Sequence, residues 1–225
     1  MPMENAVNAS TAGSSGQIVV AGAGYAGLHV ALRLAAKLRN RPVVELILAD
    51  RHDYHQVITE LPRVAAGTRA ADAVRIPLQD MLAERVHFVQ TEISGFDLPS
   101  RRVLTGAGPI GWKRLVLALG SRPNDFAIPG LAQRVLSLYS ADDAELVWAA
   151  VNKALDHAAA ATDPERQRRL ATVVVGGGGA TGSSWPANWP RYCPRRPAAT
   201  AWRPTAPLCC WSRRALPFWP APHRG

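Results

Sequence analysis

A glycine-rich turn between an apolar strand and a helix constrains the fold of this chain more than any other feature. The apolar run Gln17–Ala21 leads into Gly22-Ala-Gly24-Tyr-Ala-Gly27, and a helical pattern of apolar residues follows. Gly22 permits the tight turn, Gly24 lets a pyrophosphate approach the main chain, and Gly27 lets the helix pack closely on the strand. The helix N-terminus then offers free N–H groups and a positive dipole end to phosphates. A G-x-G-x-x-G pattern in this strand–turn–helix context predicts a dinucleotide site.

A carboxylate stands where such a site needs one. The helix is predicted to end near Arg39, and a second apolar strand, Val43–Ala49, is closed by Asp50. At the end of that strand a carboxylate can accept hydrogen bonds from ribose hydroxyls. The alternative is an ordinary tight turn, with Asp50 as a solvated strand end. The βαβ unit predicts an α/β fold with a parallel, Rossmann-type sheet.

The rest of the apolar pattern predicts further elements of such a fold. We expect a short helix, a small β-meander of three strands, a buried strand, a long helix, a surface link and one more buried strand. Their expected ranges are 78–83 for the short helix, 86–90, 92–96 and 101–104 for the meander, 113–119 for the first buried strand, 141–158 for the long helix, 162–169 for the link and 170–175 for the last strand.

A second glycine run follows that last strand. In the segment Val173–Gly182, Gly177, Gly179 and Gly182 fit the same pattern, although four consecutive glycines leave the register open by one residue. Two such fingerprints in one chain are more specific than one. We expect a disordered leader over 1–16, a first dinucleotide-binding domain over 17–135, and the start of a second dinucleotide-binding domain over 136–182.

The net charge of +9 belongs to the end of the chain. Residues 183–225 hold 7 of the 26 Lys and Arg, no Asp or Glu, all 3 Cys, 5 of the 7 Trp and 9 of the 18 Pro. The preceding 182 residues hold 19 basic and 17 acidic side chains. A basic surface for nucleic acid is therefore not predicted.

Several classes of site are not expected. Without a cysteine before Ser183, the first 182 residues offer neither a redox pair nor a cysteine nucleophile. Cys193, Cys209 and Cys210 lack the paired spacing of a zinc site, and no metal is predicted. No apolar run reaches the roughly 18 residues of a membrane span. We expect a cytoplasmic protein, with at most peripheral association at the inner face of the cell membrane.

As an ordered set, the motifs resemble those of the FAD-dependent pyridine nucleotide oxidoreductases, most closely the type II NADH dehydrogenases. The resemblance covers about residues 17–182. It rests on the two glycine runs and on the segments Asp50-Arg-His-Asp-Tyr-His55, Val64-Ala-Ala-Gly67, Ala118-Leu-Gly-Ser-Arg-Pro123 and Ile128-Pro-Gly130.

The resemblance implies two cofactors, FAD and NADH, and a quinone-type electron acceptor. It implies that the first fingerprint and Asp50 bind the ADP half of FAD, that Ile93 gives adenine a backbone contact, and that Gly120 lies close to the flavin nucleotide. NADH would bind at the second fingerprint. The residues expected to bind cofactor are Gly22, Ala23, Gly24, Tyr25, Ala26, Gly27, Asp50, Arg51, Ile93, Ala118, Gly120, Gly177, Gly179 and Gly182.

One segment departs from the family pattern. After its Tyr-His pair this chain has Gln56-Val-Ile-Thr-Glu-Leu-Pro62, where relatives carry a Phe-x-Pro-Leu-like run near the flavin ring. His55 either tunes the flavin or is a packing or surface histidine. No catalytic acid or base is assigned, because the isoalloxazine ring performs the hydride chemistry. Alternatives to the quinone reductase are a ferredoxin reductase, a sulfide:quinone reductase and a non-catalytic nucleotide-binding remnant.

The tail from Ser183 has no helix or strand period. Trp185-Pro186 and Trp189-Pro190 become Leu-Ala pairs if read one base earlier, at the spacing of the acidic helix that relatives carry there. We hypothesise that one G is lost from the G-run after Gly182, which would leave a truncated chain that binds FAD weakly and turns over poorly. The alternative is a genuine Arg/Trp/Pro-rich disordered tail.

Overall fold

The computed structural model describes residues 16–40, 44–124 and 127–176. Their contacts form two compact units. The first unit contains the chain up to Val57 together with Asp72–Ile128, and the second contains Ile58–Ala71 together with the chain from Pro129. The expected leader, the second glycine fingerprint and the tail lie outside the described residues.

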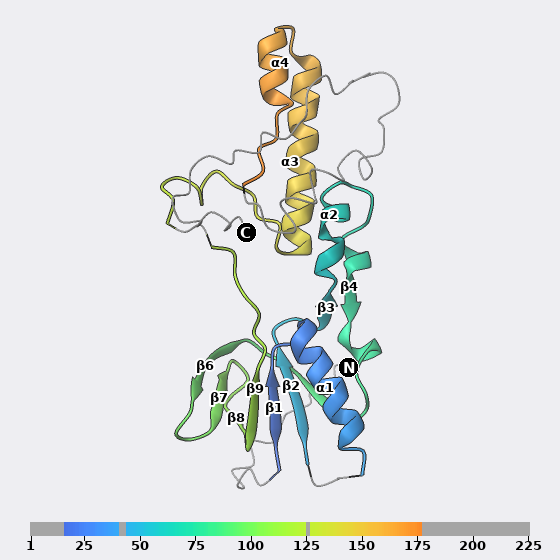
Figure 1. Cartoon of the computed structure of the whole chain (residues 1–225), viewed down its shortest axis with the longest axis vertical. Helices are drawn as coiled ribbons and strands as arrows, with labels where there is room; N and C mark the ends of the chain where they lie inside the picture. The colour runs from blue at the N-terminus through green and yellow to red at the C-terminus, as the bar shows by residue number, and fades with distance from the viewer. Residues whose placement is uncertain (1–15, 41–43, 125–126, 177–225) are drawn as a thin grey trace, which may run out of the picture. The chain divides into compact units, whose positions relative to one another are not determined.

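The first unit is built on a four-stranded, wholly parallel sheet (Figure 1). Val19 in the central strand pairs with Ile47 on one side and with Leu115 on the other. The fold class expected from the sequence is confirmed. In spatial order the strands are β5 (Val86–Gln90), β2 (Leu46–Asp50), β1 (Ile18–Ala21) and β9 (Arg114–Leu117).

Each face of this sheet is covered by a different element. Helix α1 (Tyr25–Lys37) packs on one face, where Val20 and Leu48 are fully buried. A three-stranded antiparallel meander packs on the other, where it covers Val19 and Ile47. Successive residues of a strand point to opposite faces, so the apolar runs in β1 and β2 supply both cores. The meander strands are β6 (Ile93–Asp97), β7 (Arg102–Thr105) and β8 (Ile110–Gly111).

The meander differs from the expected one. Val86–Gln90, predicted as its first strand, pairs in parallel with β2 instead, and β8, which the sequence pattern missed, takes the third place. Strand β8 is two residues long, too short to show a periodicity. The strand predicted over 113–119 is β9, but it is not buried as expected. It forms the edge of the sheet, since no further described strand lies beside it, and the Leu117 side chain is 60% exposed.

A short two-stranded ribbon completes the first unit. Strand β3 (Tyr54–Gln56) runs antiparallel to β4 (Arg75–Pro77), and His55 pairs with Ile76. The helix expected over 78–83 is a single 3₁₀ turn, η3 (Leu78–Asp80), and another, η2 (Asp72–Val74), precedes β4.

The second unit is helical in its described part. The long helix α3 (Ala141–Ala160) confirms the predicted helix and begins with a capping box. In that box the Ser140 hydroxyl accepts from Asp143 N–H, and the Asp143 carboxylate accepts from Ser140 N–H. Helix α3 packs against α2 and α4, and the unit also contains one 3₁₀ turn. These elements are α2 (Leu61–Val64), α4 (Pro164–Leu170) and η1 (Ile58–Glu60).

Two predictions for this unit are wrong. The expected surface link 162–169 contains helix α4, which Asp163 caps by accepting from Glu165 N–H and Arg166 N–H. The expected buried strand 170–175 shows only an isolated bridge at Val173, and Val174 is 72% exposed. Among the described residues, no strand lies beside this segment in a sheet that could bury it.

Two kinds of feature are absent from the described residues. None of their helices has the length and apolar character needed to cross a membrane. Within the same ranges, no group of three or more His, Cys, Asp or Glu side chains is arranged to hold a metal ion.

Candidate functional site: the turn between β1 and α1

The glycine turn lies at the carboxyl edge of the parallel sheet, where the strand order reverses. The chain runs outward from β1 to β2 and β5 on one side and reaches β9 on the other. Gly22 N–H donates to the Ala49 carbonyl at 2.8 Å, and Ala118 N–H donates to the Ala21 carbonyl at 2.8 Å. In open α/β sheets, ligands bind in the crevice at such a switch point.

Two of the three fingerprint glycines are required by close backbone packing. Gly22 has φ +103°, and a Cβ there would collide with the Ala118 carbonyl. A Cβ at Gly27 would collide with the carbonyl oxygen of Gly22. The turn therefore closes tightly on itself and on the residue that follows β9.

Gly24 differs from the other two because it faces open space. A Cβ built on it would meet no atom within 4 Å, and its φ of −67° is accessible to any residue. Gly24 is the N-cap of α1, where glycine is tolerated, but no contact within the described residues requires glycine there. A group that approaches the main chain from outside would explain it, as the pyrophosphate of a dinucleotide does.

The first turn of α1 offers uncapped N–H groups beside Gly24. Leu28 N–H donates to the Gly24 carbonyl at 2.9 Å, which makes it the first backbone bond of the helix, and no side chain caps the N-terminus. The helix has no acidic residue in its first turn. The N–H groups that precede Leu28, together with the positive end of the helix dipole, favour an anion at this place.

Asp50 connects the end of β2 to the turn. Its Oδ2 accepts from Ala23 N–H at 2.6 Å, and its Oδ1 accepts from His52 N–H at 2.9 Å. The carboxylate is partly buried, so it is not the freely solvated strand end of the alternative interpretation. Each carboxylate oxygen has a second lone pair, which leaves capacity to accept ribose hydroxyls.

His55 also belongs to the site, although the sequence left its role open between tuning the flavin and ordinary packing or surface exposure. Its side chain is buried, with 5% exposed, and its Nδ1 lies 3.2 Å from the Ala23 carbonyl oxygen. The imidazole also packs edge-on against the Tyr25 ring, with 4.6 Å between centroids. Because β3 is only three residues long, no periodicity in the sequence indicated that it would carry His55 to the turn.

The remaining predicted residues divide into four groups. Ala118 lies against the turn, as described above. Arg51 lies on the exposed surface, with its Nε 3.0 Å from His52 Nε2, and Gly120 is also exposed, with φ +76°. Ile93 starts β6 and packs into the core beneath the meander. Gly177, Gly179 and Gly182 lie outside the described residues.

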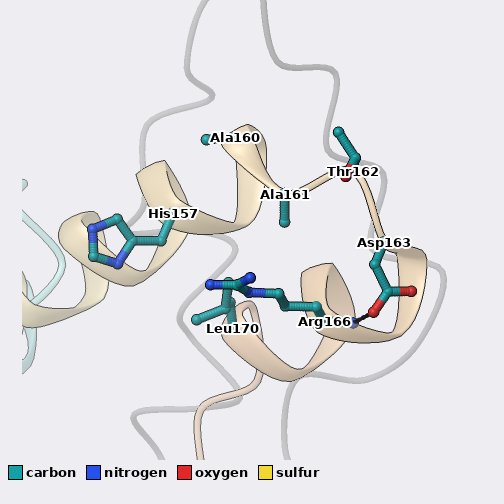
Figure 2. A pocket seen from close by; sticks show the side chains of 7 residues that line it. All are labelled: His157, Ala160, Ala161, Thr162, Asp163, Arg166 and Leu170. Atoms are coloured by element: carbon teal, nitrogen blue, oxygen red, sulfur yellow. Dashed lines mark hydrogen bonds between the residues drawn. The ribbon is translucent and has the colours of Figure 1, made fainter.

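A surface hollow in the second unit lies between the end of α3 and α4 (Figure 2). It is lined by alanines and by His157, Thr162, Asp163, Arg166 and Leu170. The Asp163 carboxylate accepts from the Arg166 backbone N–H at 3.1 Å and so serves as a helix cap. None of the predicted cofactor-binding residues lines this hollow.

The sequence matches a known family over most of its length. Residues 16–189 match the pyridine nucleotide-disulphide oxidoreductases, and the chain belongs to this family. It is 31% identical over 123 residues to the type II NADH:quinone oxidoreductase of Staphylococcus aureus, a match that covers 54% of this chain and 30% of the relative.

Solved structures show the same fold. The NDH2 of Plasmodium falciparum, determined in complex with NADH, superposes with a TM-score of 0.68 at 19% identity, over 79% of this chain and 37% of that one. The NADH:rubredoxin oxidoreductase of Clostridium acetobutylicum gives 0.56 at 20% identity, over 79% and 42%. This chain thus spans less than half the length of these relatives.

These comparisons confirm the family and the fold class expected from the sequence. FAD and a pyridine nucleotide, the two cofactors expected, are the typical cofactors of this family. The residues of the turn fit a dinucleotide, since Gly24 leaves open space beside uncapped N–H groups and Asp50 stands at the neighbouring strand end.

Proposed function

We propose that the first unit binds the ADP half of FAD and that the parent enzyme oxidises NADH through this flavin, with a quinone-type acceptor. The observation that carries the proposal is the turn between β1 and α1, with open space at Gly24 and an uncapped helix N-terminus. Membership of the pyridine nucleotide-disulphide oxidoreductases supports the flavin chemistry.

Each part of the site has a role in this proposal. The N–H groups of Gly24–Gly27, which include those of Tyr25 and Ala26, bind the pyrophosphate, while Ala23 lies in the same turn and the Asp50 carboxylate binds ribose hydroxyls. Arg51 contributes a positive charge beside that carboxylate. Ile93 supplies a backbone contact to adenine, and the segment from Ala118 to Gly120 approaches the flavin nucleotide.

The reaction itself depends on the cofactor. FAD, when bound, would supply the hydride and electron-transfer chemistry, and the protein would bind and orient the two cofactors. We propose that residues 17–135 form the FAD-binding domain and that 136–182 begin the NADH-binding domain, with Gly177, Gly179 and Gly182 at the nicotinamide nucleotide.

The most specific part of the proposal is the identity of the electron acceptor, a quinone. It is supported by the name of the S. aureus relative, a type II NADH:quinone oxidoreductase. A sulfide:quinone reductase that uses a cysteine pair is disfavoured, because residues 1–182 contain no cysteine. We also propose peripheral association with the cytoplasmic face of the membrane, as access to a lipid-soluble quinone requires, and no role for nucleic acid.

A second candidate is a non-catalytic nucleotide-binding remnant. It is favoured by the composition of residues 183–225, where a parent NADH domain would have its helices and strands. Enzyme and remnant can be separated by titrating the full chain with FAD and then following NADH oxidation at 340 nm with a soluble quinone. The same assay is run on the protein produced from a gene with one G added after the Gly182 codon.

The outcomes of this assay are distinct. Binding of FAD by both versions, with quinone reduction restored by the added base, supports the proposal and the lost-base hypothesis together. Quinone reduction by the chain as written supports the enzyme and refutes the impaired fragment. Transfer to ferredoxin or rubredoxin but not to quinone would overturn the proposed acceptor.

A further inference from the structure

The geometry points to His55 as a positioning residue that fixes the phosphate-binding turn for FAD. The inference rests on the proposed function and deepens it, because it assigns a role to a buried side chain outside the G-x-G-x-x-G pattern. We propose that His55 and Asp50 together hold two consecutive peptide groups of the turn in the orientation that a dinucleotide requires.

The two side chains bind the two polar groups of the same residue. Asp50 accepts from Ala23 N–H at 2.6 Å, and His55 Nδ1 lies 3.2 Å from the Ala23 carbonyl oxygen. A carbonyl oxygen can only accept, so the interaction requires a hydrogen on Nδ1. His55 therefore donates to Ala23 while Asp50 accepts from it.

These two contacts set the direction of neighbouring peptide groups. The peptide bond is planar and trans, so the Ala23 carbonyl and the Gly24 N–H point in opposite directions. By holding the carbonyl, His55 orients the Gly24 N–H, the group at the open glycine. In the same way Asp50, by holding the Ala23 N–H, orients the Gly22 carbonyl, against which Gly27 packs.

His55 is itself held in place from two sides. Its strand β3 pairs with β4, and the ribbon is extended by a bond from Val57 N–H to the Val74 carbonyl at 2.8 Å. The imidazole packs edge-on against Tyr25, the first residue of α1, at an interplanar angle of 74°. His55 thus contacts Ala23 and Tyr25, the residues on both sides of Gly24. These contacts restrain the backbone around Gly24, which a glycine, having no side chain, would leave free.

The test uses three variants of the full chain, chosen by where they place a donor. In His55→Asn the amide nitrogen stands the same number of bonds from Cα as Nδ1, whereas in His55→Gln it stands one bond further, as Nε2 does. His55→Leu fills the space without a donor. Titrations with FAD and with ADP, by calorimetry, give the dissociation constants, and thermal melting of the ligand-free chains gives their stability.

The inference predicts a specific order of affinities. His55→Leu and His55→Gln are expected to raise the dissociation constants of FAD and ADP about tenfold, because the Ala23 carbonyl loses its donor. The dissociation constants of His55→Asn are expected to stay within about threefold of wild type. A merely structural histidine would give affinities that follow the melting temperatures. If Asn and Gln weaken binding equally, or if none of the three changes it while wild type binds, the inference is overturned.

A second measurement needs no ligand and no activity. The ¹⁵N chemical shifts of the His55 ring in the ligand-free chain report which nitrogen carries the hydrogen. A hydrogen on Nδ1 is expected, and a neutral ring protonated only at Nε2 would overturn the inference. If His55→Leu fails to fold, the Asn and Gln pair and this spectrum still decide. Failure of wild type to bind FAD or ADP would instead refute the proposed function itself.

Discussion

At the scale of single residues, Gly27 tests whether the turn is as tight as the structure has it. A Cβ there would collide with the Gly22 carbonyl, a backbone atom that cannot move aside without opening the turn. We expect Gly27→Ala to lower the free energy of unfolding by about 1–3 kcal/mol, as overpacking does, and to abolish FAD binding. Gly95→Ala is the matched control, because its Cβ would meet only the Leu104 side chain, at 3.6 Å. Equal melting temperatures for the two variants would contradict the close packing.

Asp50 gives a second prediction at this scale. Its two carboxylate oxygens accept from Ala23 N–H and His52 N–H, and an asparagine can replace only one of these acceptors. We expect Asp50→Asn to destabilise the ligand-free protein by about 1 kcal/mol, since either the part-buried Ala23 N–H or the exposed His52 N–H loses its acceptor, and to weaken the binding of ADP. Chemical denaturation and an ADP titration measure the two effects. Unchanged ADP affinity would remove Asp50 from the proposed site.

At the scale of secondary structure elements, α3 depends on its capping box. Ser140→Ala removes the acceptor for Asp143 N–H and is expected to cost about 1 kcal/mol of stability in the second unit. Ser140→Asp keeps an acceptor at the cap and serves as the control. Denaturation followed by circular dichroism distinguishes the two, and a variant Ser140→Ala as stable as Ser140→Asp would show that the cap contributes nothing.

The turn between β6 and β7 should respond to pH. The Ser100 backbone N–H donates to the Asp97 carboxylate at 3.0 Å, and this hydrogen bond is the main reason why the pKa of Asp97 is lowered below its usual value. A hydrogen bond from the Ser100 side chain lowers the pKa further. A lowered folded-state pKa means that the contribution to stability is present above the unfolded-state pKa and is lost as the pH falls through the folded-state pKa. An NMR titration of the Asp97 carboxyl should show the lowered midpoint, and Ser100→Pro, which removes the N–H, should raise it. An unshifted midpoint in wild type would contradict the hydrogen bond.

The sequence predicted the elements with a clear period or motif and missed those without one. The long helix α3 and the strand–turn–helix at Gly22–Gly27 carry their own local signals. Strand β5 was assigned to the wrong sheet, because its pattern does not say which strand it pairs with. The two-residue β8 and the three-residue β3 are too short for a period, which is why the approach of His55 to the turn was not foreseen.

At the scale of the whole molecule, the composition of residues 183–225 makes a prediction about the gene. If one G is lost after the Gly182 codon, an added base should replace the Trp- and Pro-rich tail with the acidic, apolar helix that the family resemblance implies. Resequencing this region and comparing the circular dichroism of both versions tests this, with a gain of helix expected for the restored version. A restored reading frame that soon meets a stop codon, or that gives no added helix, would contradict the hypothesis.

An FAD titration of wild type and of Gly24→Ala tests whether the turn between β1 and α1 holds FAD. A Cβ at Gly24 meets no atom within the described residues, so the ligand-free variant should stay folded and lose only about 1 kcal/mol, the cost of alanine at a helix N-cap. We expect saturable binding of one FAD per wild-type chain, measured by flavin fluorescence, and at least about tenfold weaker binding by Gly24→Ala, because the methyl group occupies the space of the pyrophosphate. Absence of binding by wild type, or equal affinity of the two proteins, would contradict it.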